Sequence, residues 1–222
     1  MHNNITFLNV KKNDEIRTYI KQADLSLEAL GFTEHSFAHA TKCAEIAGTI
    51  LHDLNYSDND VELAKIAAYM HDIGNVVNRA DHAHSGAIIS FRLLEKMGMS
   101  PTDIAVIVTA IGNHDEKTAF PVNPVAAAVI LADKTDVRRS RVRAGAALCT
   151  DIHDRVNYAV EKTDLVLDKE SKTITAYLTI DTAISPVMDY FEIFLDRMLL
   201  CRKAADYLGL KFQLNINGKG LL

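Results

Sequence analysis

Residues 67–75 read AAYMHDIGN, so an apolar helical run ends on the adjacent pair His71-Asp72. An imidazole and a carboxylate side by side at the end of an apolar helix face inward, where they can bind an ion. Gly74 follows, and glycine lets the backbone turn beside such a site. Three other His-Asp pairs occur, and the apolar helix is the context that singles out this one. The other pairs are His52-Asp53, His114-Asp115 and His153-Asp154.

On both sides of this stretch, apolar residues recur every three or four positions, which predicts helices over most of the first 160 residues. Start signals support the prediction: Ser57 precedes one helix, and Ser100-Pro101 and Asn123-Pro124 begin two others. The fold class that we predict is mostly α, with these helices packed as a bundle. The expected helices cover about residues 14–30, 36–54, 58–74, 82–97, 100–114, 123–134 and 144–161.

The pattern changes after residue 161. Residues 165–167 and 173–180 predict a hairpin, residues 185–208 a long helix, and residues 212–216 a third short strand. We therefore expect a helical domain over residues 1–161 and a small C-terminal α+β (β-β-α-β) appendage over residues 162–222, packed on it. An apolar stripe on the long helix is expected to be core or a dimer contact. The stripe consists of Tyr190, Phe191, Phe194, Leu195, Met198 and Leu199.

The composition of the 222 residues excludes several classes of protein. The proportions of 48% hydrophobic and 24% charged residues are typical of a soluble globular protein. A net charge of -5 gives no overall basic surface, so neither a nucleic acid nor a membrane is an expected partner. Cys43, Cys149 and Cys201 stand far apart, which argues against a disulfide framework and favours a reducing cytoplasm. We expect no signal peptide and no membrane span.

Five short motifs follow one another along the chain. They are residues 39–44 (HATKCA), 69–75 (YMHDIGN), 82–87 (HAHSGA), 111–116 (IGNHDE) and 129–136 (VILADKTD). The first, second and last resemble the ordered signature of the HD superfamily of metal-dependent phosphohydrolases. The other two fall where members with two metals carry additional histidines. The resemblance covers about residues 31–136 and implies a helical bundle of the HD type.

The resemblance also implies a set of metal ligands and a divalent cofactor. One ion would be held by both members of His71-Asp72 with His39 and Asp133, and Asp72 would bridge to a second ion. Because members with a single metal exist, one or two ions are expected. Imidazole and carboxylate ligands without thiolate suit Mn, Fe, Co, Ni or Mg. The implied ligands are His39, His71, Asp72, His82, His114 and Asp133.

A basic run directly follows the last implied ligand. It consists of Lys134, Arg138, Arg139, Arg141 and Arg143. We predict that Lys134 and Arg138 bind a substrate phosphate, because they share a helical face if the helix continues that far. The other arginines are expected to form a solvated face. The residues expected to take part in catalysis are Asp72, His82 and Lys134.

These residues predict hydrolysis of a phosphate ester by metal-activated water, with a nucleotide or similar small phosphorylated metabolite as substrate. After His114 the chain reads Ala119-Phe120-Pro121, without the Gly-Tyr-Pro element of the branch that cleaves cyclic dinucleotides. That substrate is therefore not expected. The alternative is a metal-stabilised module for ligand sensing or oligomerisation without turnover, and the complete ligand set favours the enzyme. A homodimer remains open.

The remaining histidines have less specific interpretations. His35 shares a helical face with His39, and a helix cap, an outer contact and a metal contact all remain open for it. His84 is expected to face solvent or to donate a proton. His52 and His153 are expected to be structural. Two acids that either orient ligands or lie at the surface are Asp115 and Asp136.

Overall fold

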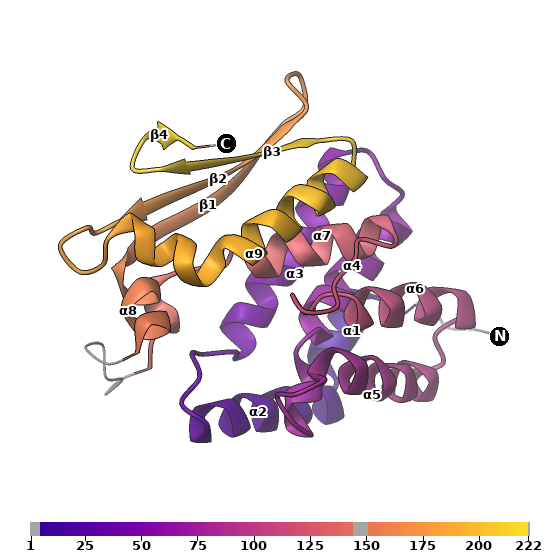
Figure 1. Cartoon of the computed structure of the whole chain (residues 1–222). Coiled ribbons are helices and arrows are strands. Elements are labelled where there is room, and N and C mark those ends of the chain that lie inside the picture. Colours follow the sequence, from indigo (N-terminus) through magenta and orange to yellow (C-terminus); the bar gives the residue numbers. More distant parts are fainter. Residues whose placement is uncertain (1–4, 144–150, 222) are drawn as a thin grey trace.

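The computed structural model describes residues 5–143 and 151–221, which form a helical body with a small sheet along one side (Figure 1). These residues contain nine α-helices and a sheet of four strands. No described helix has both the length and the apolarity that crossing a bilayer requires. The helices are α1 (Phe7–Lys12), α2 (Asp14–Ala29), α3 (Phe37–Asp53), α4 (Asp58–Met70), α5 (His82–Met97), α6 (Pro101–Gly112), α7 (Pro124–Lys134), α8 (Ile152–Ala159) and α9 (Val187–Tyr207).

The predicted start signals are used as expected. Side-chain oxygens of Ser57, Ser100 and Asn123 each accept a hydrogen bond from a backbone N–H in the first turn of α4, α6 and α7. The helix predicted to reach Gly74 instead ends at Met70, and a short 3-10 helix follows over Ile73–Val76. The predicted helix over 144–161 is observed only as α8, because Asp151 caps a helix there and Val160 begins a strand. Residues 144–150 lie outside the described residues.

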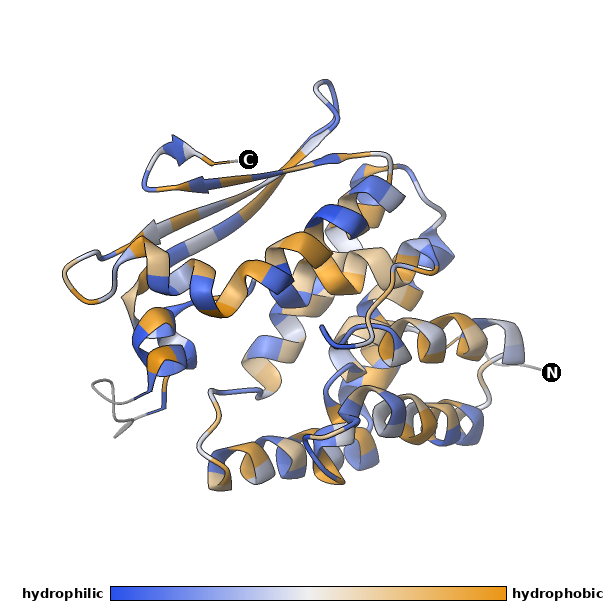
Figure 2. Ribbon diagram, in the orientation of Figure 1, coloured by the Kyte–Doolittle hydropathy of each residue, from blue (hydrophilic) through white to orange (hydrophobic). Residues whose placement is uncertain are grey.

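The core is centred on α7. All eight residues from Val125 to Ala132 are buried, as the run VAAAVILA predicts. Helix α7 packs against α3, α4, α6 and α9, and the apolar colouring continues from α7 into the neighbouring helices (Figure 2). A helix buried on every side places its C-terminal residues, Asp133 and Lys134, in the interior.

The C-terminal sheet has the strand order β1-β2-β3-β4. Strands β1 and β2 form the predicted hairpin, and α9 carries the chain back so that β3 pairs parallel to β2. The register pairs Ile174 with Phe212 and Ala176 with Leu214, which places buried side chains on one face. The fourth strand, only two residues long, was not predicted. The strands are β1 (Val160–Asp168), β2 (Thr173–Ile180), β3 (Lys211–Ile216) and β4 (Lys219–Gly220).

Helix α9 connects the sheet to the helical body (Figure 1), because it packs on both α7 and β3. In its apolar stripe, Tyr190, Phe194 and Met198 are buried, whereas Leu195 and Leu199 are exposed. The buried half of the stripe is therefore part of the core, which was one of the two expectations for it, the other being a dimer contact. The expected boundary between residues 161 and 162 falls inside β1.

Candidate metal centre

Four side chains from three helices place ligand atoms against one another. Nε2 of His39 lies 3.3 Å from Nε2 of His71 and 3.4 Å from Oδ1 of Asp133. Nε2 of His71 lies 3.0 Å from Oδ2 of Asp72 and 3.5 Å from Oδ1 of Asp133. His39 comes from α3, Asp133 from α7, and the other two from the end of α4. Ligands far apart in the sequence therefore meet at one point.

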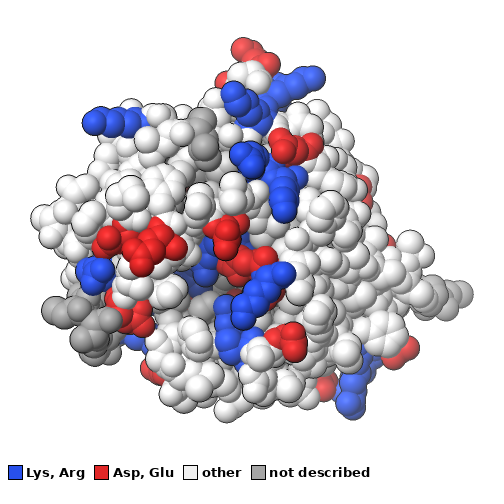
Figure 3. Space-filling model, viewed as in Figure 1, with Lys and Arg blue, Asp and Glu red and all other residues white. Residues whose placement is uncertain are grey.

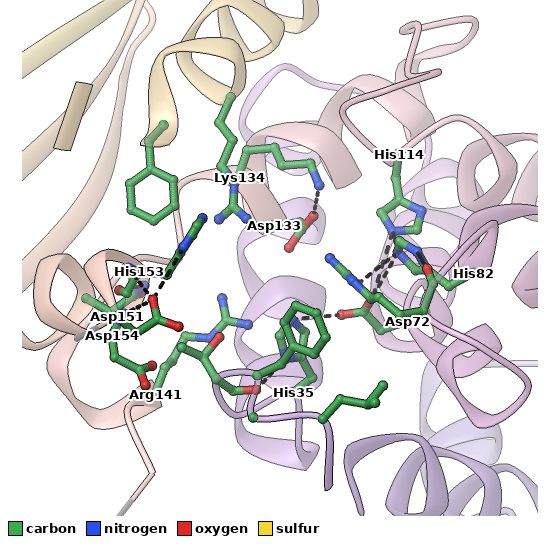
Figure 4. Close-up of a pocket in the computed structure, with 18 residues that line it drawn as sticks. His35, Asp72, His82, His114, Asp133, Lys134, Arg141, Asp151, His153 and Asp154 are labelled. Atoms are coloured by element: carbon green, nitrogen blue, oxygen red, sulfur yellow. Dashed lines mark hydrogen bonds and ion pairs between the residues drawn. The ribbon is translucent and has the colours of Figure 1, made fainter. Parts of the chain in front are cut away.

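The second oxygen of Asp72 faces another group of ligand atoms (Figure 4). Oδ1 lies 3.3 Å from Nε2 of His82 and 3.9 Å from Nε2 of His114, and these two nitrogens are 3.2 Å apart. His82 begins α5 and His114 follows α6. Asp72 thus presents one oxygen to each group, as a carboxylate that bridges two ions would.

The hydrogen bonds of the Nδ1 atoms determine which nitrogen of each imidazole carries the proton. In three of the rings, Nδ1 lies close to a backbone carbonyl: His71 at 2.7 Å from Ala68, His82 at 3.0 Å from Arg79, and His114 at 2.6 Å from Ile111. A carbonyl can only accept, so each Nδ1 donates and the neutral ring presents a bare Nε2.

His39 is oriented in the same way by an acid. Its Nδ1 lies 2.8 Å from Oδ2 of the fully buried Asp136. In the neutral rings, the Nε2 atoms of His39 and His71, and those of His82 and His114, therefore face each other as acceptors. A cation at each position would satisfy all of these atoms, so the residues fit a metal centre.

The electrostatics of the cluster favour a bound positive charge. Burial alone would lower the pKa of His71, but the Asp72 and Asp133 carboxylates raise it to about 10. Although burial opposes it, His71 keeps the pKa of Asp72 well below its ordinary range, and Lys134 with His71 does the same for Asp133. Burial, then His71 and Lys134, lower the pKa of His114 to about 3. His114 therefore remains neutral, the form in which imidazole binds a metal.

Gly74 allows the two groups of ligand atoms to approach each other. A Cβ at Gly74 would overlap the carbonyl oxygen of His82 and the backbone nitrogen of Gly86. The backbone at Gly74 is not in the left-handed region, so the expectation that it provides a special turn is wrong. Gly74 is required because the 3-10 helix and α5 lie in direct contact, and this contact brings His82 to Asp72.

A buried lysine adjoins the ligands. Nζ of Lys134 lies 2.6 Å from Oδ2 of Asp133 and 3.4 Å from Oε1 of Glu116. Burial would lower the pKa of Lys134, but these two acids raise it, so the ammonium group is charged. Nε of Arg197, from α9, lies 2.6 Å from the same oxygen of Glu116. Against the effect of burial, Lys134 and Arg197 lower the pKa of Glu116 to about 2.

The cluster opens into a pocket of about 380 Å³. A hollow with acidic and basic side chains around it is visible on the face shown in Figure 3, and Figure 4 shows the lining side chains. Four metal-ligand candidates and Lys134 reach the pocket, and α8 and α9 complete its wall. The lining residues are Leu30, Gly31, Phe32, Thr33, His35, Asp72, Arg79, His82, His114, Asp133, Lys134, Arg141, Asp151, His153, Asp154, Asn157, Phe194 and Arg197.

The structure brings together the six implied ligands and Lys134, but it separates Arg138 from them. Helix α7 ends at Lys134, so the expected shared helical face does not exist. Nε of Arg138 instead lies 2.9 Å from Oδ1 of Asp136, and Arg138 lines a different surface pocket together with Lys42. Its expected contact with substrate phosphate is therefore wrong on geometry.

Several other expectations change as well. His35 lines the pocket, with Nδ1 bound to the Thr33 carbonyl at 2.7 Å and Nε2 3.9 Å from Oδ2 of Asp72. His153, expected to be structural, also lines the pocket. His52 and His84 are largely exposed and lie outside it, as expected.

Three arginines at the pocket were missed or misjudged. Arg141 was expected to be solvated, but it is buried because it donates to the carbonyls of Glu34 and Asp136. Arg79 stands three residues before His82, and its guanidinium group lies 3.4 Å from that ring. That spacing was a usable signal. Arg197 had none, because only the packing of α9 brings it to the site.

The central part of the chain matches a known family. Residues 34–138 match the family model of the HD domain. The chain therefore contains an HD domain. The HD domain contains all six implied ligands and Asp136, and members of this family are typically metal-dependent phosphohydrolases. The described structure adds that the HD domain has His and Asp clusters that can hold metal ions.

The chain also aligns with individual proteins. Ribonuclease Y of Opitutus terrae is 30% identical over 113 residues, covering 51% of this chain and 20% of that protein. The uncharacterized protein MJ1020 of Methanocaldococcus jannaschii is 25% identical over 178 residues, covering 69% of this chain and 68% of the relative. A crystal structure of a predicted HD superfamily hydrolase from an uncultured Thermotogales bacterium is similar, with 26% identity and a TM-score of 0.44, covering 56% of this chain and 67% of that one.

Proposed function

We propose that this protein hydrolyses a phosphate ester of a small metabolite with the help of one or two divalent ions, and that nucleotides are the first substrate class to test. One observation carries the proposal: two groups of bare imidazole nitrogens share the carboxylate of Asp72 at the bottom of a pocket that also holds a charged, buried lysine. This combination supplies both metal binding and phosphate binding.

The ligand groups divide the metal binding between them. His39, His71 and Asp133 with Oδ2 of Asp72 would hold one ion, and His82 and His114 with Oδ1 of Asp72 would hold the other. When bound, such ions polarise a phosphoryl oxygen and lower the pKa of water to near neutrality. The protein supplies the fixed geometry, since each imidazole is held through its Nδ1.

The chemistry of the ligands limits the choice of metal. Cys43 lies near His39, with Sγ 3.6 Å from Nδ1, but burial and nearby carboxylates raise the pKa of the thiol. The thiol is therefore neutral, and its hydrogen points to the Ala132 carbonyl. Nitrogen and oxygen ligands remain, which suit Mn, Fe, Co, Ni or Mg better than a closed zinc site.

Cationic side chains beside the ligands would bind the phosphate. Lys134 is nearly fully buried and held by Asp133 and Glu116. The guanidinium group of Arg79 stacks over Phe32, 5.6 Å from the ring centre, next to His82. Charges fixed in advance at a water-poor site stabilise developing negative charge without reorganisation. We assign the phosphate contacts to Lys134 and Arg79.

The direct test combines metal analysis with phosphate release. The purified protein should contain one or two equivalents of a transition metal, and activity on a panel of nucleotides and sugar phosphates should depend on added Mn or Co. A full metal complement without turnover on any phosphate ester would favour the sensing or oligomerising module instead. A short RNA belongs in the panel, because the chain is similar to a protein named ribonuclease Y.

A further inference from the structure

The wall of the pocket opposite the metal ligands belongs to α8. Asp154 and Asn157 stand three residues apart and so lie on one face of this helix. Both line the pocket, and they are only 8% and 6% exposed. Polar side chains this deeply buried ordinarily have hydrogen-bond partners. What they contact within the protein therefore indicates what a ligand must supply.

Among residues 5–143 and 151–221, no hydrogen bond occupies the carboxylate oxygens of Asp154 or Oδ1 of Asn157, so these side chains offer acceptors to the pocket. Nδ2 of Asn157 donates one of its two hydrogens to the His153 carbonyl at 2.8 Å, which leaves the second N–H and the acceptor Oδ1. The Asp154 carboxylate takes part in no hydrogen bond or ion pair with a described residue, whereas Asp151 accepts from the backbone of His153 at 2.7 Å as the helix cap. Burial, and then Asp151, raise the pKa of Asp154.

The pocket is therefore chemically divided. One side carries the metal ligands and the cations Lys134 and Arg79, which attract a phosphate. The other carries Asp154 and Asn157, which attract hydrogen-bond donors. Figure 4 shows Asp151 and Asp154 on one side and Asp72, His82 and His114 on the other. Arg141 also lies on the side of Asp154 (Figure 4), but it is buried and donates to the carbonyls of Glu34 and Asp136. A second phosphate group against Asp154 would meet a carboxylate and would be repelled.

Building on the proposed function, we propose that the substrate is a phosphate ester whose far end carries N–H donors, bound by Asp154 and the Asn157 side-chain oxygen. The chemistry required is an amino group or a ring N–H, which a carboxylate accepts strongly. An amino-bearing nucleobase and an aliphatic amine share this chemistry. A buried acceptor left without its donor is costly, so an analogue lacking the donor should be disfavoured.

Two matched substrate pairs test the proposal and distinguish the sources. Adenosine 5'-monophosphate and purine riboside 5'-monophosphate differ by one exocyclic amino group, and the base of the second carries no N–H donor. 2-Aminoethyl phosphate and propyl phosphate have the same length, and only the first carries an ammonium group. The wild-type protein should prefer the amino-bearing member of at least one pair by about tenfold or more in kcat/KM. The pair that shows the preference identifies the source.

Variants connect the preference to α8. Asp154→Asn replaces a charged acceptor at constant size and should bring the preferred ratio close to one. Asp164→Asn removes an exposed carboxylate of β1, paired with Lys162 outside the pocket, and should keep the wild-type ratio. A wild-type ratio near one in both pairs, or equal losses for both members of a pair in Asp154→Asn, would overturn the proposal.

The same compounds separate this proposal from the proposed function. If no phosphate is released from any of the four, hydrolysis of such esters is ruled out. The dissociation constants of the four compounds for the metal-loaded protein are then measured by calorimetry. A tenfold preference in binding that disappears in Asp154→Asn would support donor recognition, and equal dissociation constants would reject it.

Discussion

Nδ1 of His39 lies 2.8 Å from Oδ2 of Asp136, and Oδ1 of the same carboxylate receives Lys42 and Arg138 at 2.9 Å each. Asp136 is thus a fully buried acid. One of its oxygens accepts from a metal-ligand candidate, and the other contacts two cations. Arg138 therefore contacts the acid that orients His39, which is a different role from the phosphate contact expected of it.

Asp136→Asn should therefore weaken metal binding without removing a ligand. The amide is a weaker acceptor for the His39 N–H, so we expect the affinity for Mn to fall by about 10- to 100-fold. Titration of the metal-free protein by calorimetry gives this value. Asp53→Asn, a partly exposed acid at the end of α3, is the control and should leave the affinity unchanged. An unaltered affinity in Asp136→Asn would show that the contact does not tune His39.

The shared position of Asp72 predicts a difference between ligand variants. Asp72→Ala removes an oxygen from each group, so both ions should be lost and activity abolished. His114→Ala and His82→Ala each remove one nitrogen of the second group and should each lower the metal content by one equivalent. Elemental analysis measures the stoichiometry, circular dichroism checks the fold, and His52→Ala is the control. Retention of one ion by the wild type and by both histidine variants would reduce His82 and His114 to substrate contacts.

Lys134→Met should impair catalysis more than metal binding. Loss of a buried phosphate contact costs about 2 to 4 kcal/mol, or roughly thirty- to a thousandfold in kcat/KM. Steady-state kinetics on the best phosphate ester measure this effect, alongside metal content. Because Asp133 and Glu116 lose a partner, the melting temperature should also fall. Near wild-type kcat/KM in this variant would place the phosphate contact on other residues.

Metal binding should strengthen as pH rises. In the metal-free protein the pKa of His71 is raised to about 10, so at neutral pH this ring carries a proton that an ion must displace. Release of this proton when an ion binds at His39, His71 and Asp133 makes the affinity of that site rise about tenfold per pH unit between roughly pH 6 and pH 8, and fall correspondingly as pH falls. Calorimetry in buffers of different ionisation enthalpy counts the released proton. A pH-independent affinity would mean that His71 is neutral before the ion binds.

Gly74→Ala should destabilise the protein. The added methyl group overlaps backbone atoms of His82 and Gly86, which cannot move as a side chain can. Overpacking of this kind lowers the free energy of unfolding by about 1 to 3 kcal/mol. Gly112→Ala is the matched control, because its Cβ would meet only the Ala87 methyl at 3.8 Å, an ordinary contact. Chemical denaturation of both variants distinguishes backbone crowding from a general effect of replacing glycine.

The helices, and the His and Asp side chains that meet at the candidate metal centre, could be predicted because their signals are local. Ser100-Pro101 and Asn123-Pro124 mark helix starts within a few residues, and the HD motifs keep their order along the chain. The pocket wall could not be predicted in this way. Arg197 reaches Glu116 only because α9 packs on α7. Arg141 is buried because it donates to the carbonyl of Glu34, more than a hundred residues away in the sequence, and to the nearby carbonyl of Asp136. Such contacts leave no periodic pattern.

The candidate metal ligands and the pocket-wall residues of α8 and α9 come from different parts of the chain. The six ligands all lie before residue 134, whereas Asp154, Asn157, Phe194 and Arg197 all lie after residue 150. A tail exchanged between relatives would therefore remodel the mouth of the pocket while leaving the reactive centre as it is. In such a chain the candidate metal centre and the selectivity of the pocket can change independently of each other, provided that α9 still packs on α7.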